Sequence, residues 1–223
     1  MSWINEFIDQ WMPYITQASK ETFYMVSISL VISVVIGIPL GIFLVLTRPN
    51  QALANKFVFQ ALNVLINIIR SIPFIILLFF LIPFTKLISG TTIGVRGVIV
   101  PLVIYTAPYL ARLLETSLLE VNQGVIEAYE AMGIKTRHII WHVMLRESRS
   151  SIVLGLTIVT ISLIGATAMA GLVGAGGLGD LAYRFGHIRY EVDVMYTTVL
   201  ILIIVVQLIQ TAGNKLAAFL KKD

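Results

Sequence analysis

Long uninterrupted runs of apolar residues dominate the chain. The run at 22–47 carries no charged side chain across 26 positions, and a helix needs about 20 apolar residues to cross a bilayer. Because the runs are continuously apolar rather than alternating, they predict transmembrane helices instead of barrel strands. We therefore predict an all-α membrane protein with five transmembrane helices at about 22–47, 57–85, 93–114, 150–173 and 194–214. The third span has the shortest uncharged run, between Arg96 and Arg112, and needs both arginines to snorkel to the interfaces.

The residues before the first span predict a helix that lies on the membrane surface. Apolar residues recur there at helical spacing and form one face: Trp3, Ile4, Phe7, Ile8 and Trp11. Such a face is typical of an interfacial amphipathic helix, which we assign to residues 1–21. The segment has no basic n-region before the apolar run, so we do not expect a cleavable signal.

The basic residues orient the predicted bundle, because cytoplasmic loops carry an excess of lysine and arginine. The N-terminus and the loops at 85–97 and 174–193 together hold five basic residues: Lys20, Lys86, Arg96, Arg184 and Arg189. The alternate set holds ten: Arg48, Lys56, Arg112, Lys135, Arg137, Arg146, Arg149, Lys215, Lys221 and Lys222. We predict that the N-terminus is outside and that the 112–149 segment and the tail at 215–223 are cytoplasmic.

Composition agrees with lipid as the solvent. The chain is 57% hydrophobic and 13% charged, with a mean hydropathy of +0.90, whereas soluble domains carry about 25% charged residues. The absence of cysteine excludes disulfides and thiolate chemistry. A net charge of +4, scattered along the chain, gives no argument for nucleic-acid binding.

The longest polar stretch predicts a helical elbow, at 120–148. Residues 122–132 suit a short helix that Asn122 caps, and Gly133 can end it in the left-handed conformation. Thr136 is the expected cap of a second helix. That helix buries one apolar face, made of Ile139, Ile140, Val143 and Met144.

The elbow resembles the EAA loop of ABC importer permeases. The family pattern reads E-A-A, three residues, G, nine residues, I, one residue, L-P. Here Glu127, Ala128, Gly133 and Leu145 match the pattern. Tyr129 replaces its last alanine, Val143 its isoleucine and Arg146 its proline. Loss of the proline at Arg146 lets the second helix continue toward Arg149. The stretches at 67–94 and 165–186 are similar to the methionine-uptake permeases of the same superfamily.

This resemblance implies a machine of several subunits in the bacterial cytoplasmic (inner) membrane. The family forms a homodimer of five-helix subunits with two cytoplasmic ATPase subunits and an external substrate-binding lipoprotein. The chain contains no G-x-x-x-x-G-K-[ST] motif, so ATP and magnesium are expected in the partner ATPase and no cofactor in this chain. We expect the elbow to dock on the ATPase through six residues: Glu127, Ala128, Ala131, Met132, Gly133 and Ile134.

Three further groups of residues resemble functional sites but lack the context that those sites need. Residues 174–179, GAGGLG, match the dinucleotide-binding G-x-G-x-x-G, but that motif requires a strand before it, and an apolar span precedes it here. We read these glycines as a tight turn at the membrane surface. His138 and His142 have metal-ligand spacing but no third ligand. The acids Asp180, Glu191 and Asp193 lack triad partners. We therefore predict no catalytic, cofactor or metal residue.

Arg70 interrupts the second span and ends a polar stripe of Gln60, Asn63 and Asn67. A charge at the bilayer centre costs at least about 2.5–3.5 kcal/mol. The arginine is therefore expected to snorkel to the cytoplasmic interface or to pack against the elbow. Pro73 is expected to kink this helix.

The fourth span is the candidate wall of a transport path. Small residues and one methionine share a face, and the gate candidates among them are Ser162, Ala166, Met169 and Ala170. Met169 suits a flexible plug for an apolar amino acid. Ordinary interior packing explains such a small-residue face equally well.

The predicted function is therefore an ATP-driven importer permease that moves methionine by alternating access. One alternative keeps the machine and changes the cargo to another amino acid or a phosphonate. An ion-coupled secondary carrier would need intramembrane carboxylates, and Glu115 is the one acid near a span core. A membrane-assembly subunit is the third alternative.

Overall fold

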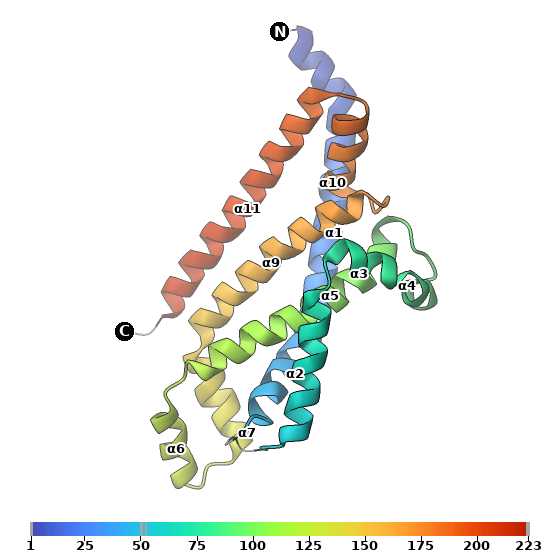
Figure 1. The fold of residues 1–223 in the computed structure, drawn as a ribbon. Coiled ribbons are helices and arrows are strands. Elements are labelled where there is room, and N and C mark those ends of the chain that lie inside the picture. The colour runs from blue at the N-terminus through green and yellow to red at the C-terminus, as the bar shows by residue number, and fades with distance from the viewer. Residues whose placement is uncertain (1, 50, 52, 222–223) are drawn as a thin grey trace. The chain divides into compact units, whose positions relative to one another are not determined.

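The computed structural model describes residues 2–49, 51 and 53–221, and the side chains of residues 5–49, 51 and 53–221. Within this part of the chain the regular structure is helical throughout (Figure 1). The helices are α1 (Ser2–Leu46), α2 (Lys56–Ser71), α3 (Phe74–Phe80), α4 (Ile82–Ser89), α5 (Gly94–Leu119), α6 (Gln123–Ala131), α7 (Thr136–His138), η1 (Ile139–Met144), α8 (Leu145–Glu147), α9 (Arg149–Gly171), α10 (Gly177–Leu181), η2 (Ala182–Ile188) and α11 (Val192–Leu220). The segments η1 and η2 are π-helical. The prediction of an all-α protein is confirmed.

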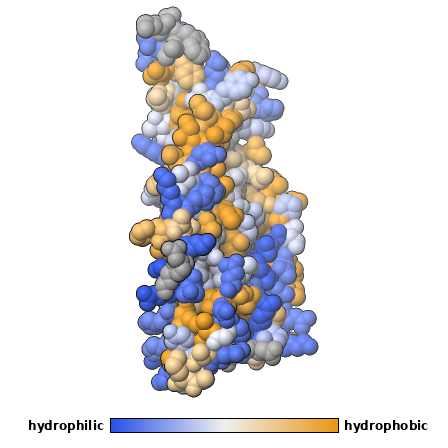
Figure 2. All heavy atoms as spheres, turned by 90° about the vertical axis from the view of Figure 1, so that its left-hand side faces the viewer, coloured by the Kyte–Doolittle hydropathy of each residue, from blue (hydrophilic) through white to orange (hydrophobic). Residues whose placement is uncertain are grey.

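Four helices are long and apolar enough to cross a membrane within the described residues. They are Asn5–Leu46 of α1, α5, α9 and α11, and a fifth span results if α2 and α3 count as one broken span. Large apolar side chains lie open to the surroundings on α11, among them Leu200, Ile203 and Leu208. Figure 2 shows one face of the molecule, on which apolar atoms reach the surface among polar ones. Exposed apolar side chains on a helix of this length suit a lipid environment.

The second predicted span is wrong as a single helix. The structure divides this region into α2, α3 and α4, with the first break between Ser71 and Phe74. Pro73 has an extended backbone (ψ 137°) and stands at the N-cap of α3. A proline disfavours helical backbone at the residue before it, so the chain leaves the helix here instead of only kinking.

The N-terminal segment is part of the first long helix. Helix α1 runs without interruption from Ser2 to Leu46, so no helix boundary separates residues 2–21 from the first apolar run. The side chains of Trp3 and Ile4 lie outside the described residues, whereas Trp11 is buried and Ile8 is exposed. Whether this segment lies on the membrane surface stays a prediction.

The chain folds into two compact units. The first comprises residues 1–32, 72–105 and 160–208, and the second residues 33–71, 106–159 and 209–223. The core of the first unit gathers aromatic and aliphatic side chains around α1 and α10: Trp11, Ile15, Ala18, Leu178, Leu181 and Val194. The core of the second unit lies where α1, α5 and the elbow meet, and is described below with the elbow.

Candidate functional site

The elbow between α5 and α9 is the best-defined candidate site. Its first helix, α6, begins as predicted, because the Asn122 side chain accepts a hydrogen bond of 2.8 Å from the Gly124 N–H. This bond satisfies one of the free N–H groups that every helix start leaves open. The short helix therefore has a fixed beginning even though it contains only nine residues.

Gly133 ends α6 as predicted. Its φ is +72°, its N–H donates to the Glu130 carbonyl at 2.9 Å, and the Ile134 N–H donates to the Tyr129 carbonyl at 3.2 Å. These two bonds define a Schellman motif. Tyr129 and Ile134, the pair that usually closes this motif by apolar contact, both pack against the same buried cluster.

The second helix of the elbow starts differently from the prediction. Thr136 is the first helical residue of α7 instead of its cap. Lys135 occupies the cap position with extended backbone and no side-chain cap bond, and its carbonyl accepts from the His138 N–H at 2.8 Å. The helix then continues through η1 and α8 to Glu147, as the loss of the family proline at Arg146 predicts.

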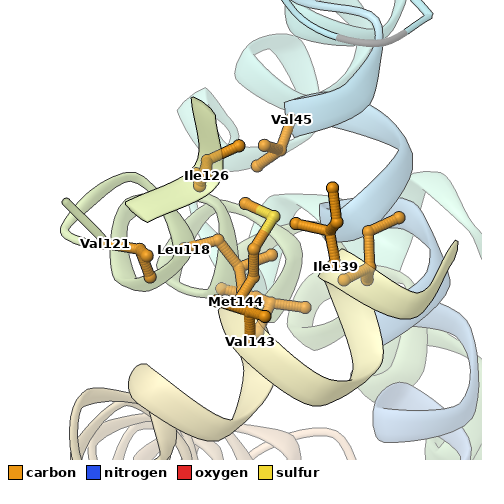
Figure 3. Packing of buried hydrophobic residues seen from close by; sticks show 9 residues of the cluster. Val45, Leu118, Val121, Ile126, Ile139, Val143 and Met144 are labelled. Atoms are coloured by element: carbon orange, nitrogen blue, oxygen red, sulfur yellow. The ribbon is translucent and has the colours of Figure 1, made fainter. Parts of the chain in front are cut away.

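The predicted apolar face of the second helix is buried in full. The elbow contributes Ile126, Ile139, Ile140, Val143 and Met144 to a cluster with Val45, Leu114, Leu118 and Val121 (Figure 3). Burying one such aliphatic side chain contributes roughly 1.5–3 kcal/mol. The wide turn of η1 brings residues five apart onto one side, which lets Ile139 and Met144 reach the same cluster. The elbow is thus anchored to α1 and α5 by packing.

The opposite face of α6 is open. Of the six residues predicted to dock on a partner, five are exposed: Glu127, Ala128, Ala131, Met132 and Gly133. Ile134, the sixth, is half-buried because it belongs to the Schellman contact. Met132 and Trp141 are both 65% exposed. The elbow therefore presents small and apolar side chains to the outside while its other side is fixed.

A buried carboxylate joins two arginines at the end of α1 and on α5. Glu115 is 3% exposed; it pairs with Arg112 at 2.6 Å and with Arg48 at 3.5 Å. Arg112 also donates to the side-chain oxygens of Asn63 and, at 3.1 Å, of Asn67. One carboxylate and two arginines thereby join the end of α1, α2 and α5. Sequence reasoning missed this cluster, although Asn63 and Asn67 belonged to the predicted polar stripe.

Arg70, which ends that stripe, makes a different contact from Asn63 and Asn67. Its guanidinium lies 5.6 Å from the centroid of the Tyr109 ring, a cation–π distance. Tyr109 belongs to α5, so the contact ties α2 to α5 and not to the elbow. Asn63, Asn67 and Arg70 therefore all contact α5.

The candidate gate residues of α9 divide between two environments. Ala166 and Ala170 are buried, at 4% and 0% exposure, so they pack inside the first unit. Met169 is 49% exposed, and Ser162 is half-buried. The structure therefore leaves Met169 free to meet a partner or a substrate and places the two alanines in close helix packing.

The glycine-rich segment after α9 forms a tight turn, as the sequence predicted. Gly174, Gly176 and Gly177 all have positive φ, between 79° and 83°. The first two N–H groups after Gly176 each donate to a side chain of α1. The Glu21 carboxylate accepts from Gly177 at 2.7 Å, and the Thr22 hydroxyl accepts from Leu178 at 2.9 Å. These anchors are 156 residues away in sequence and had no local signal. The N–H groups of Gly177 and Leu178 are therefore bonded to side chains of the same chain.

The two histidines of the elbow lie together without forming a metal centre. The rings of His138 and His142 stack, with centroids 5.6 Å apart. Within the residues that the structure describes, no group of three or more His, Cys, Asp or Glu side chains is placed to hold a metal ion.

Apolar membrane-length helices joined by a capped, packed elbow are the architecture of the membrane component of a transporter. Residues 37–222 match the model of the binding-protein-dependent transport system inner membrane component family. The chain belongs to this family, and the resemblance seen in the elbow is confirmed.

Named relatives narrow the comparison. The chain is 45% identical over 199 residues to the probable D-methionine transport system permease protein MetI of Vibrio cholerae, covering 89% of this chain and 88% of that one. It is 43% identical over 179 residues to the methionine import system permease protein MetP of Bacillus subtilis, covering 80% and 81%. A solved chain of the MetNI methionine ABC transporter, in an inward-facing conformation, matches with a TM-score of 0.93 and 43% identity, covering 95% of this chain and 98% of that chain.

Proposed function

We propose that the chain is the permease subunit of an ATP-driven importer that moves methionine into the cytoplasm by alternating access. The observation that carries this proposal is the match over 95% of the chain to a methionine ABC transporter. Relatives at 43–45% identity in two distant bacteria carry methionine-permease names. The chain is a multi-pass protein of the bacterial inner membrane, in agreement with its family and its apolar helices.

Hydrolysis of ATP belongs to a partner subunit in this proposal. The sequence contains no P-loop motif, and the family is the membrane component of its transport systems. Two ATPase subunits that bind ATP and magnesium would dock on the elbows of a permease homodimer. An external binding lipoprotein would deliver methionine to the opposite side of the membrane, where the N-terminus is predicted.

The elbow is suited to transmit a displacement. Its exposed face carries Ala128 and Ala131, small side chains that let another surface approach the helix backbone. Its buried face is fixed to α1 and α5 by the cluster around Leu118. A rigid element that is anchored on one side and open on the other moves as a body. ATP-driven closure of the ATPases would therefore pull α1 and α5 through the elbow.

The path for methionine is proposed to run along α9. Met169 is exposed on this helix, and its unbranched thioether side chain can fill and leave a narrow passage. Ser162 lies on the same side, whereas Ala166 and Ala170 would bring a neighbouring helix close. In a homodimer the two Met169 side chains would close the path between substrate passages.

Uptake of radiolabelled methionine by proteoliposomes that contain this chain and its ATPase tests the proposal. We expect ATP-dependent, vanadate-sensitive uptake that excess unlabelled methionine suppresses and histidine or a phosphonate does not. Suppression by histidine or a phosphonate in place of methionine would overturn the assignment of methionine as the cargo. Uptake that follows an imposed ion gradient without ATP would overturn the assignment to ATP-driven importers.

An elbow variant tests the proposed coupling face. Ala128→Glu puts a charge on the contact surface, and we expect lost uptake while the subunit still inserts. Gln123→Glu adds the same charge at the start of the same helix, outside the proposed contact set, and is expected to transport normally. Equal uptake in the two variants would place the ATPase contact elsewhere.

A further inference from the structure

A groove of about 510 Å³ runs between α1 and the start of α5, within the first unit. Its lining residues on α1 recur from Gln17 to Ile28, which are 11 positions apart. At 1.5 Å per residue the groove follows the helix for about 16 Å. It is therefore elongated along α1, and its lining includes no residue of the elbow or of α9.

One end of the groove is basic. Lys20 and Arg96 are exposed lining residues, and the structure gives neither of them an ion pair within the described part of the chain. Glu21 also lines the groove, but its carboxylate accepts from the Gly177 N–H and from the Gln17 amide, at 2.7 and 2.8 Å. Two cations and one carboxylate leave a net charge of +1 at this end.

The start of α5 strengthens the attraction for an anion. The first turn of this helix contains no acidic residue and instead carries Arg96. The Gly94 N–H donates to the Gly174 carbonyl at 3.1 Å, but the helix dipole still makes that end positive, so a cation near it is unfavourable. An anion placed there would interact favourably with the helix end and with Arg96 at the same time.

The other end of the groove is apolar. Tyr24 and Ile28 from α1 face Ile99 from α5 across it. Residues 22–47 form the uncharged run of the first span, so the apolar end continues from the basic end toward the predicted membrane interior. A cationic head region that leads into an apolar channel has the same polarity along its length as a phospholipid.

We propose that this groove binds one anionic phospholipid. The phosphodiester lies at Lys20, Arg96 and the start of α5, and an acyl chain lies along Tyr24, Ile28 and Ile99. A zwitterionic amino acid fits less well, because the Glu21 carboxylate that would hold its ammonium group is already engaged with Gly177 and Gln17. A small soluble anion would leave the apolar end uncovered. The proposal requires a bilayer and does not depend on the cargo.

Native mass spectrometry of the full chain released from phosphatidylglycerol nanodiscs tests the site, with phosphatidylcholine nanodiscs as the comparison. We expect one tightly retained phosphatidylglycerol on the wild type. Each cation near an anionic lipid contributes about 1 kcal/mol, or about fivefold in affinity. The double variant Lys20→Gln/Arg96→Gln is therefore expected to lose roughly 25-fold in retention. Lys86→Gln removes an exposed lysine of α4 that does not line the groove and is expected to retain the lipid.

Three outcomes would overturn the proposal. Equal losses in Lys86→Gln and in Lys20→Gln or Arg96→Gln would mean that only the overall surface charge attracts the lipid. Displacement of the lipid by glycerol phosphate at equal concentration would mean that the apolar end contributes nothing. Ile28→Asn supports the site if it lowers retention of phosphatidylglycerol without changing the thermal unfolding of the lipid-free chain, and unchanged retention in a folded Ile28→Asn chain argues against it.

Discussion

Replacing Gly133 tests whether the elbow must be rigid to transmit motion. Gly133 has a φ of +72°, and a Cβ added there would meet no atom within 4 Å. The cost of a substitution is therefore conformational and not steric. A left-handed backbone costs an ordinary L-residue about 1–2 kcal/mol, with β-branched residues at the upper end and asparagine tolerated best. We expect a strain of about 2 kcal/mol for Gly133→Val and considerably less for Gly133→Asn.

That strain is relieved if the Schellman motif opens. Opening breaks the bonds from Gly133 to Glu130 and from Ile134 to Tyr129, and it frees Ile134 from the buried cluster. A strain of about 2 kcal/mol changes the ratio of ordered to opened elbow by a factor of about 30. A loosened elbow would absorb the displacement of the ATPase instead of passing it to α1 and α5.

The assay is the number of methionine molecules imported per ATP hydrolysed in proteoliposomes. We expect Gly133→Val to hydrolyse ATP with a strongly reduced import ratio, while the subunit still inserts and assembles. Gly133→Asn should stay near the wild type. A wild-type ratio in Gly133→Val would refute a rigid coupling role, and equal damage in Gly133→Asn would refute backbone strain as the cause.

Four further substitutions give separate tests. Glu115→Gln removes the charge that joins Arg48 and Arg112. We expect it to lower the free energy of unfolding, measured by thermal denaturation, by about 1–3 kcal/mol. An unchanged free energy of unfolding would refute a structural role for Glu115. Thr22→Val leaves the buried Leu178 N–H without its acceptor and should cost a similar amount in the same assay. Gly179→Ala would place a Cβ 2.3 Å from the Ala168 carbonyl oxygen, so a folded, wild-type-like yield would contradict the close packing of these segments. Met169→Ala should raise the passive methionine leak of proteoliposomes, and unchanged leak and transport would exclude a plug.

The elbow was predictable because its signals are local. Asn122 as a cap and Gly133 as a left-handed terminator act within a few residues of their own positions. The apolar face of the second helix follows from helical spacing in the same way. The cap at Lys135 was not predictable, because any residue can adopt its extended backbone and no side-chain bond marks it. The docking role of the open face stays a prediction.

Long-range polar contacts could not be predicted. No local pattern indicates that Glu21 and Thr22 accept hydrogen bonds from a turn 156 residues away, since both residues also suit the surface end of a membrane helix. The break near Pro73 was underestimated because the stretch 57–85 is apolar on both sides of Pro73, with Arg70 as its one charge. Hydropathy measures where a chain is apolar, whereas backbone geometry decides whether it is one helix.

The elbow is tied to more than α1 and α5. Immediately after it, the Arg149 guanidinium donates to the Leu220 carbonyl at 2.9 Å, and the Ser150 hydroxyl donates to the Ala217 carbonyl at 2.9 Å. The carbonyls at a helix C-terminus have no partner within the helix, and a cation is favourable there. The last turn of α11 is therefore fastened to the first turn of α9. In the proposed mechanism, a displacement of the elbow would carry this joint with it, so the start of α9 and the end of α11 would move together.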